Sequence, residues 1–166
     1  VFLGPEMKST GEVMGIDSNI GSAFLKAMRS DGYMVPKTGT AFLSVSDSDK
    51  PRLLSIASKL IKLGFNLIAT KGTYAFLNSN NIECNEIYKV GEGRPNVVDE
   101  ILNDNIQIVI NSPEGPQSRS DEEAIGRTSV MKNVLTITTI SGAKAAIDSM
   151  KHLNEVNVKA LQEYFE

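Results

Sequence analysis

A threonine-rich turn with one lysine and one glycine is the first stretch of the sequence that could bind a ligand. Residues 69–73, Ala-Thr-Lys-Gly-Thr, lie between a β-branched run and an amphipathic stretch. A strand that enters a helix through a tight turn at Gly72 presents backbone N–H groups, the positive end of the helix dipole and the hydroxyls of Thr70 and Thr73 to an anion such as phosphate. The turn matches neither the Walker loop nor the dinucleotide-binding glycine pattern. A simple capped turn, in which Thr73 satisfies backbone donors, is the alternative.

Two lysines lie at positions where they could join this turn around one phosphate. Lys50 falls within the first turn of a predicted helix, where the helix dipole disfavours a cation unless an anion or solvent compensates. Neighbouring Asp47 and Asp49 supply such an anion without any ligand. Lys89 ends a predicted strand, and the carboxyl ends of strands in a parallel sheet meet at one shared crevice. A solvated lysine at position 50 and a polar strand end at position 89 remain the alternatives.

Short β-branched runs alternate with amphipathic stretches of helical period, which predicts repeated βα units. The fold class expected is therefore α/β, with a doubly wound, five-stranded parallel sheet and flanking helices. The most apolar run, Ile-Gln-Ile-Val-Ile-Asn, is expected to be an interior strand. Strands are predicted at residues 40–46, 66–70, 82–88, 106–111 and 134–138. Helices are predicted at residues 19–30, 48 to a stop at Gly64, 72–80, 97–102, 121–132, 141–150 and 158–165.

Composition places the chain among ordinary globular domains. It has 166 residues, 17 Lys and Arg against 20 Asp and Glu, and a formal net charge of −3, so one core is expected and nucleic-acid binding is not. Cys84 is the only cysteine and His152 the only histidine, which excludes an intrachain disulfide, a four-cysteine zinc site and histidine-based metal triads. No apolar run is long enough for a membrane span. We expect a reducing, cytoplasmic location without membrane contact.

Five sequence stretches together resemble one known family. They are residues 3–15 (Leu-Gly-Pro-Glu-Met-Lys-Ser-Thr-Gly-Glu-Val-Met-Gly), the Ser-Val-Ser-Asp-Ser-Asp-Lys of 44–50, the turn at 69–73, the Lys-Val-Gly-Glu-Gly-Arg-Pro of 89–95 and the Ile-Asn of 110–111. In order and spacing these stretches resemble the carboxyl-terminal part of the carbamoyl-phosphate synthase large chain. The resemblance implies a methylglyoxal-synthase-like fold for residues 17–166, preceded by the tail of an ATP-grasp domain in residues 1–16.

The resemblance implies a regulatory domain that is not itself catalytic, within an ATP-dependent, glutamine-hydrolysing ligase. Such a domain would bind a nucleoside monophosphate, with uridine monophosphate as inhibitor and inosine monophosphate as activator in enterobacterial members, and so adjust carbamoyl phosphate synthesis for pyrimidine and arginine biosynthesis. The parent enzyme would use ATP with Mg or Mn, whereas this chain needs no cofactor. The effector-binding positions that the resemblance implies are Lys50, Thr70, Gly72, Thr73, Lys89 and Asn111.

One position departs from the family pattern, and two more match a second ligand. Pro113 stands where enterobacterial members have a threonine that helps to hold the nucleotide, so a hydroxyl is lost. Asp121 and Thr138 match positions that bind ornithine at the border with the preceding domain. From the residues alone, Asp121 is also explained as a helix N-cap and Thr138 as a strand end. Implied partners are the rest of the large subunit, the glutaminase small subunit and a further large chain in an oligomer.

Methylglyoxal synthase, a lyase acting on dihydroxyacetone phosphate, is the alternative from another class. Its chemistry needs a carboxylate base in a glycine-rich loop and a histidine acid. This sequence has Pro95 and Asn96 where that enzyme has its aspartate, and no histidine follows the strand at residues 106–111. Asp99 lies nearby but on the predicted helix that follows. A purely structural oligomerisation domain is the third possibility, and ligand binding would discriminate it from the others.

Overall fold

The computed structural model describes residues 13–112, 119–155 and 157–164. Its five strands form one parallel sheet in the order β3-β2-β1-β4-β5, which confirms the predicted fold class. The strands are β1 (Gly39–Val45), β2 (Phe65–Thr70), β3 (Asn85–Ile87), β4 (Ile108–Ser112) and β5 (Leu135–Ile137). The helices are α1 (Ile20–Ser30), α2 (Lys50–Lys62), α3 (Lys71–Ser79), α4 (Val97–Leu102), α5 (Arg119–Met131) and α6 (Ile140–Ser149), with 3₁₀ turns at Met150–His152 and Leu161–Tyr164.

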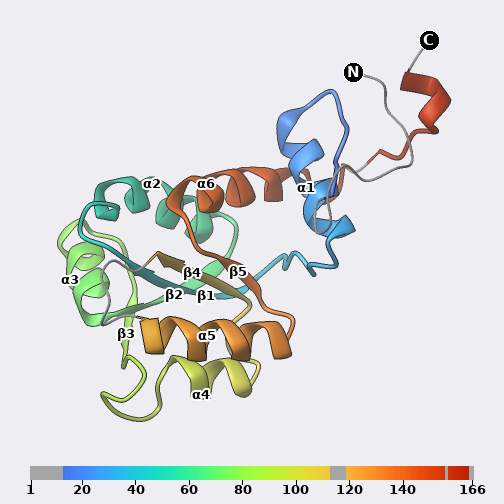
Figure 1. The fold of residues 1–166 in the computed structure, drawn as a ribbon. Coiled ribbons are helices and arrows are strands. Elements are labelled where there is room, and N and C mark those ends of the chain that lie inside the picture. Colours follow the sequence, from blue (N-terminus) through green and yellow to red (C-terminus); the bar gives the residue numbers. More distant parts are fainter. Residues whose placement is uncertain (1–12, 113–118, 156, 165–166) are drawn as a thin grey trace.

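Helices cover both faces of the sheet, with α2 and α6 on one side and α4 and α5 on the other (Figure 1). The side chains of β1 alternate between the two faces, as the pleat requires. Leu43 packs with Leu53 of α2 and Ile147 of α6, and Phe42 packs with Ile125 of α5 in a second cluster. Because both faces are buried, the inner strands are mostly apolar, with polar residues near their ends. The predicted interior strand, β4, indeed lies between β1 and β5.

Local signals in the sequence explain where the helices begin and end. The side chain of Asn19 caps α1 by accepting from the N–H of Gly21 at 2.7 Å, and Pro51 occupies the first turn of α2, where its missing N–H has no cost. Gly64, at φ +88°, ends the α2 turn in a conformation that favours glycine. Asn96 starts α4 with a reciprocal capping box to Asp99.

Three element predictions need correction. The last predicted helix, at residues 158–165, is only a 3₁₀ turn, Leu161–Tyr164, because it has no buried sheet face to pack against. The third strand is only Asn85–Ile87, because this edge strand pairs with its one neighbour only along Ile68–Thr70 of β2. Helix α5 begins at Arg119, so Asp121 lies inside its first turn and is not its N-cap. The loop at residues 113–118, which includes Pro113, and residues 1–12 lie outside the described part of the chain.

Candidate functional site

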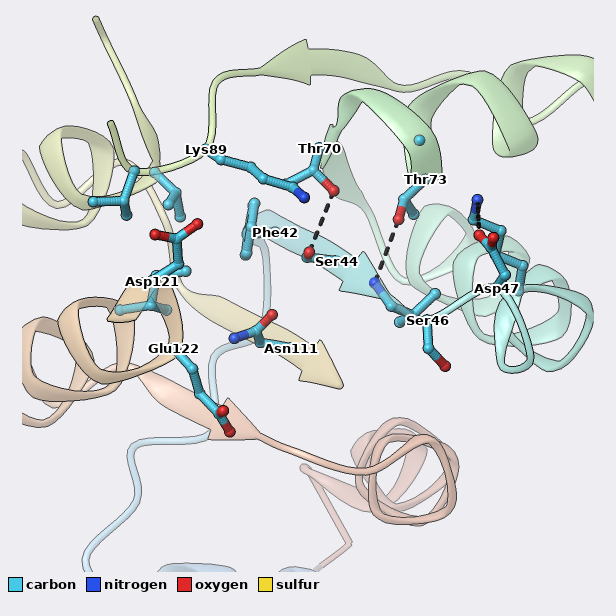
Figure 2. Close-up of a pocket in the computed structure, with 16 residues that line it drawn as sticks. Phe42, Ser44, Ser46, Asp47, Thr70, Thr73, Lys89, Asn111, Asp121 and Glu122 are labelled. Carbon is cyan, nitrogen blue, oxygen red and sulfur yellow. Dashed lines mark hydrogen bonds and ion pairs between the residues drawn. The ribbon is translucent and has the colours of Figure 1, made fainter. Parts of the chain in front are cut away.

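A crevice of about 560 Å³ opens at the carboxyl edge of the sheet, a size that suits a small organic ligand. It lies where the strand order reverses, since β1 is followed by β2 on one side and has β4 on the other. Open α/β sheets bind their ligands at this switch point. The six predicted effector positions all line this one crevice: Lys50, Thr70, Gly72, Thr73, Lys89 and Asn111. Figure 2 shows several of them converging from different elements.

The start of α3 keeps its backbone donors available. Thr70 occupies the N-cap position, yet no side chain caps the helix. The Thr70 hydroxyl instead donates to Ser44 Oγ of β1 at 3.3 Å, and Thr73 Oγ1 accepts from the N–H of Val45 at 3.3 Å. The first amides of a helix have no partner within it, so the α3 amino terminus offers N–H groups and a positive dipole end to the crevice. Thr73 does satisfy a backbone donor, as the alternative expected, but that donor belongs to β1 and no side chain caps α3.

Lys50 contributes the nearest positive charge to this helix start. It is the first residue of α2, as predicted, and a Cβ atom at Gly72 would lie 3.6 Å from its Nζ. The ammonium group thus lies against the first turn of α3. It forms an ion pair with Asp47, with 2.6 Å between Nζ and Oδ1, and this contact lowers the pKa of the Asp47 carboxyl. An anion of the chain itself therefore compensates the charge of Lys50, which is one of the alternatives that the sequence left open.

Lys89 supplies a second cation from the opposite wall. It follows β3, where its backbone N–H donates to Glu92 Oε2 at 3.3 Å. Figure 2 shows its side chain extending over the crevice toward Thr70. None of the ion pairs in the described part of the chain involves Lys89. Its ammonium group is therefore available to a bound anion.

Asn111 lies at the centre of the crevice, beside Ser44 in the β1–β4 register. The residue is only 5% exposed, and its side-chain amide faces the open crevice (Figure 2). No other side chain that the structure describes forms a hydrogen bond with this amide. It can therefore donate to one ligand atom and accept from another.

Acidic side chains line one end of the crevice. Asp121 and Glu122, from the first turn of α5, line it on the side away from Asp47 (Figure 2), and Phe42 and Ile125 add an apolar floor. A ligand that fits carries an anion at one end and hydrogen-bond donors at the other. Asp121 was assigned with Thr138 to a second ligand, but Thr138 is exposed at the end of β5 and does not line this crevice.

Four polar lining residues were missed by the sequence analysis as parts of the site: Ser44, Ser46, Asp47 and Glu122. Ser44 lies at the carboxyl end of β1 and Ser46 directly follows it, so the rule that strand ends face the crevice could have found them. Glu122 follows Asp121 in the same helical turn. Asp47 was considered only as a neighbour that neutralises Lys50.

The residues that the lyase alternative needs are elsewhere. Asp99 accepts from the backbone N–H of Asn96 at 2.9 Å and pairs with Arg94 at 3.0 Å. His152, the only histidine of the sequence, pairs with Glu155 at 2.9 Å, and its ring lies against Gly21 of α1. Neither Asp99 nor His152 lines the crevice. Burial raises the pKa of the Cys84 thiol to about 12, so it offers no thiolate nucleophile at neutral pH.

Comparison with known proteins agrees with the fold. The family model of the MGS-like domain matches residues 52–138. The chain belongs to the MGS-like domain family. The matched segment contains the α3 turn, Lys89 and Asn111, and Lys50 lies just before it. No helix among the described residues has the length and apolar character needed to cross a membrane.

Similar proteins are carbamoyl phosphate synthase large chains. The C-terminal section of that chain from Aquifex aeolicus is 48% identical over 99% of this chain and 32% of its own length. The C-terminal section from Methanopyrus kandleri is 49% identical over 94% of this chain and 29% of its own. The large chain from Acidobacterium capsulatum is 49% identical over 89% of this chain and 14% of its own. The chain thus spans a third or less of the relatives that it matches.

Proposed function

We propose that this chain is the regulatory domain of a carbamoyl phosphate synthase large chain and that its crevice binds a nucleoside monophosphate effector. The observation that carries the proposal is the convergence of two lysines on an uncapped helix start, beside the Asn111 amide that faces the crevice. Phosphate would lie between Lys50 and Lys89, above the first amides of α3. The similarity to large chains supplies the protein context.

The acidic end of the crevice favours a nucleotide over free phosphate. Asp121 and Glu122 are placed to accept hydrogen bonds from ribose hydroxyls or base N–H groups, and the apolar floor at Phe42 and Ile125 suits one face of a base. Asn111, between the two ends, can donate to an oxygen and accept from a hydroxyl. Among the family effectors, uridine and inosine monophosphates fit this division of charge.

In the parent enzyme this domain would adjust carbamoyl phosphate synthesis for the pyrimidine and arginine pathways in the cytoplasm. Its partners there would be the remaining domains of the large subunit, the glutaminase small subunit and a second large chain. ATP with Mg or Mn would be bound by those other domains. Ornithine binding through Thr138 would need residues of the preceding domain, and Asp121, which lines the nucleotide crevice, would be shared between the two ligands.

Thermal unfolding with a matched set of ligands tests the proposal. A ligand present at about 100 times its Kd should add roughly 2.7 kcal/mol of stability. We expect uridine or inosine monophosphate to raise the melting temperature of the 166-residue chain and uridine without phosphate to leave it unchanged. Equal effects of nucleoside and nucleotide, or no effect of either monophosphate, would contradict the proposal. Formation of methylglyoxal from dihydroxyacetone phosphate would favour the lyase instead.

A further inference from the structure

The position of the Lys50 ammonium group is electrostatically costly without an anion. It belongs to the first residue of α2 and lies against the first turn of α3, so the positive ends of two helix dipoles act on it. Its side chain is only 17% exposed, which limits screening by solvent. An anion at this point is therefore strongly favoured whether or not a ligand is present.

In the structure Asp47 supplies that anion. The distance between Asp47 Oδ1 and Lys50 Nζ is 2.6 Å. Asp47 also lines the crevice, and Figure 2 shows it on the side of the crevice where Thr73 lies. The carboxylate thus holds the cation that a ligand phosphate would use.

Little else holds Asp47 in place. Its side chain is 93% exposed, and in the described part of the chain it has no second ion pair and no hydrogen bond to another side chain. It lies in the turn between β1 and α2, where the Ser46 and Ser48 hydroxyls bond to each other at 2.9 Å. Because the Asp47 side of the ion pair is exposed, its carboxylate can move into solvent at small cost once another anion neutralises Lys50.

Neighbouring Asp49 is different. Its carboxylate accepts from Ser112 Oγ at 2.8 Å and lies 3.8 Å from Arg52, so it is engaged away from the Lys50 ammonium. The two aspartates carry the same charge two residues apart, yet only one contacts the cation of the crevice. Substitutions at Asp47 and at Asp49 therefore distinguish the effect of a direct contact with Lys50 from the effect of any nearby negative charge.

We propose that Asp47 is an internal counter-ion that occupies Lys50 in the empty crevice and is displaced by the phosphate group of the effector. The proposal rests on the proposed function, because it needs a phosphate ligand that uses Lys50. Asp47 then sets the affinity of the site: each binding event must open the Asp47–Lys50 pair and place a phosphate dianion near an expelled carboxylate. Lys89, which has no such partner among the described residues, would make the first contact with the incoming anion.

Titration calorimetry of the 166-residue chain with uridine monophosphate, inosine monophosphate and inorganic phosphate tests this role. Asp47→Asn keeps the size of the side chain and removes the charge. We expect it to bind the phosphate probes about three- to tenfold more tightly, since a weak ion pair no longer competes and a repulsive charge is gone. Asp49→Asn keeps an acceptor for Ser112 and should change affinity less than about twofold.

The same aspartate substitutions in a Lys50→Met chain test whether the change in affinity depends on the ion pair. In a Lys50→Met chain the cation is absent, so the competing contact cannot form. There the gain from Asp47→Asn should fall to that of Asp49→Asn, and the two substitutions at 47 and 50 should be non-additive. Additive effects, equal gains in the two aspartate variants, or weaker binding by Asp47→Asn would each overturn the counter-ion role.

The failures of the two proposals can be told apart. Wild-type binding of the monophosphates with no gain in Asp47→Asn would reject the counter-ion and leave the effector site standing. Binding that ignores Lys50→Met and Lys89→Met would show that the ligand lies elsewhere, and would reject both. Absence of binding in the wild type and in Asp47→Asn would also reject both.

Discussion

The two lysines of the crevice have different surroundings, and this difference determines what each can contribute to binding. Lys50 is held between Asp47 and the start of α3, whereas Lys89 extends from a loop without a carboxylate partner among the described residues. Lys71 belongs to the same turn as Thr70 and Thr73 but is exposed and does not line the crevice. It therefore provides a natural comparison for the loss of one positive charge.

Replacement of Lys89 by methionine should weaken binding of the monophosphates without changing stability. A charge-assisted hydrogen bond to phosphate contributes about 1.5–3 kcal/mol, which corresponds to a loss of affinity of roughly 10- to 150-fold. Calorimetry on Lys89→Met and on Lys71→Met checks this, and the control should lose less than about threefold. Equal losses in the two variants would mean that only the overall field of the molecule matters.

The hydroxyls of Thr70 and Thr73 join α3 to β1, and this role was not evident from the turn sequence alone. Thr73 is buried and accepts from the backbone N–H of Val45, whereas Thr70 donates to the side chain of Ser44. One hydroxyl thus satisfies a buried backbone donor and the other connects two hydroxyl groups. The contact of Thr73 with the Val45 N–H therefore holds β1 and α3 together more strongly than the contact of Thr70 with Ser44.

Thr73→Val should therefore destabilise the chain more than Thr70→Val. Valine keeps the shape of threonine but leaves the Val45 N–H without an acceptor, at a cost of about 1–3 kcal/mol. Thr70→Val removes one long contact between side chains, at about 1 kcal/mol or less. Urea denaturation gives both free energies of unfolding at pH 7. A neutral Thr73→Val, or the reverse order, would contradict this description of the turn.

Most of this architecture follows from the sequence because the signals are local. The alternation of apolar runs predicts the five strands, and Asn19, Pro51 and Gly64 mark the ends of two helices within a residue or two. The true start of α5 at Arg119 was missed, because the polar residues before Asp121 give no apolar periodicity. The helix was therefore expected to begin at Asp121, and this residue was interpreted as its N-cap, whereas it lies inside the first turn of α5.

The candidate site was predicted in part for a similar reason. Lys50, Thr70 and Lys89 follow or precede apolar runs directly, so the strand-end rule brings them together. The Asp47–Lys50 contact depends on the conformation of the turn between β1 and α2 and on the rotamers of two side chains. No periodic pattern encodes these. The sequence offers Asp47 and Asp49 equally as partners of Lys50, and the three-dimensional structure shows that Asp47 is the one in contact.

Considered over the whole molecule, ion pairs fasten the helical layer on the α2 side of the sheet. Asp148 of α6 binds Lys59 of α2 and, at 3.1 Å, Lys144 of its own helix. At the other end of the layer, Asp17 binds Lys26 of α1 at 2.8 Å. The hydrogen bond from Lys26 lowers the pKa of Asp17 to about 2, and the one from Lys59 lowers the pKa of Asp148. The crevice, by contrast, lies at the edge of the sheet and does not depend on these pairs.

The lowered pKa values of these two carboxyl groups predict that the chain loses stability in acid. A carboxyl group whose pKa is lower in the folded than in the unfolded chain stabilises the fold above the unfolded value, near 3.8, and loses that effect as pH falls toward the folded value. We therefore expect Asp148→Asn to be less stable than the wild type at pH 7. The difference should shrink as pH falls from about 5 toward 2, where the wild-type carboxyl is protonated and resembles the amide.

Urea denaturation of both chains across this pH range measures the difference in the free energy of unfolding. Asp31→Asn is the control, because Asp31 is exposed and has no ion pair among the described residues. A difference that stays constant with pH would mean that Asp148 stabilises the layer by packing and not by its charge.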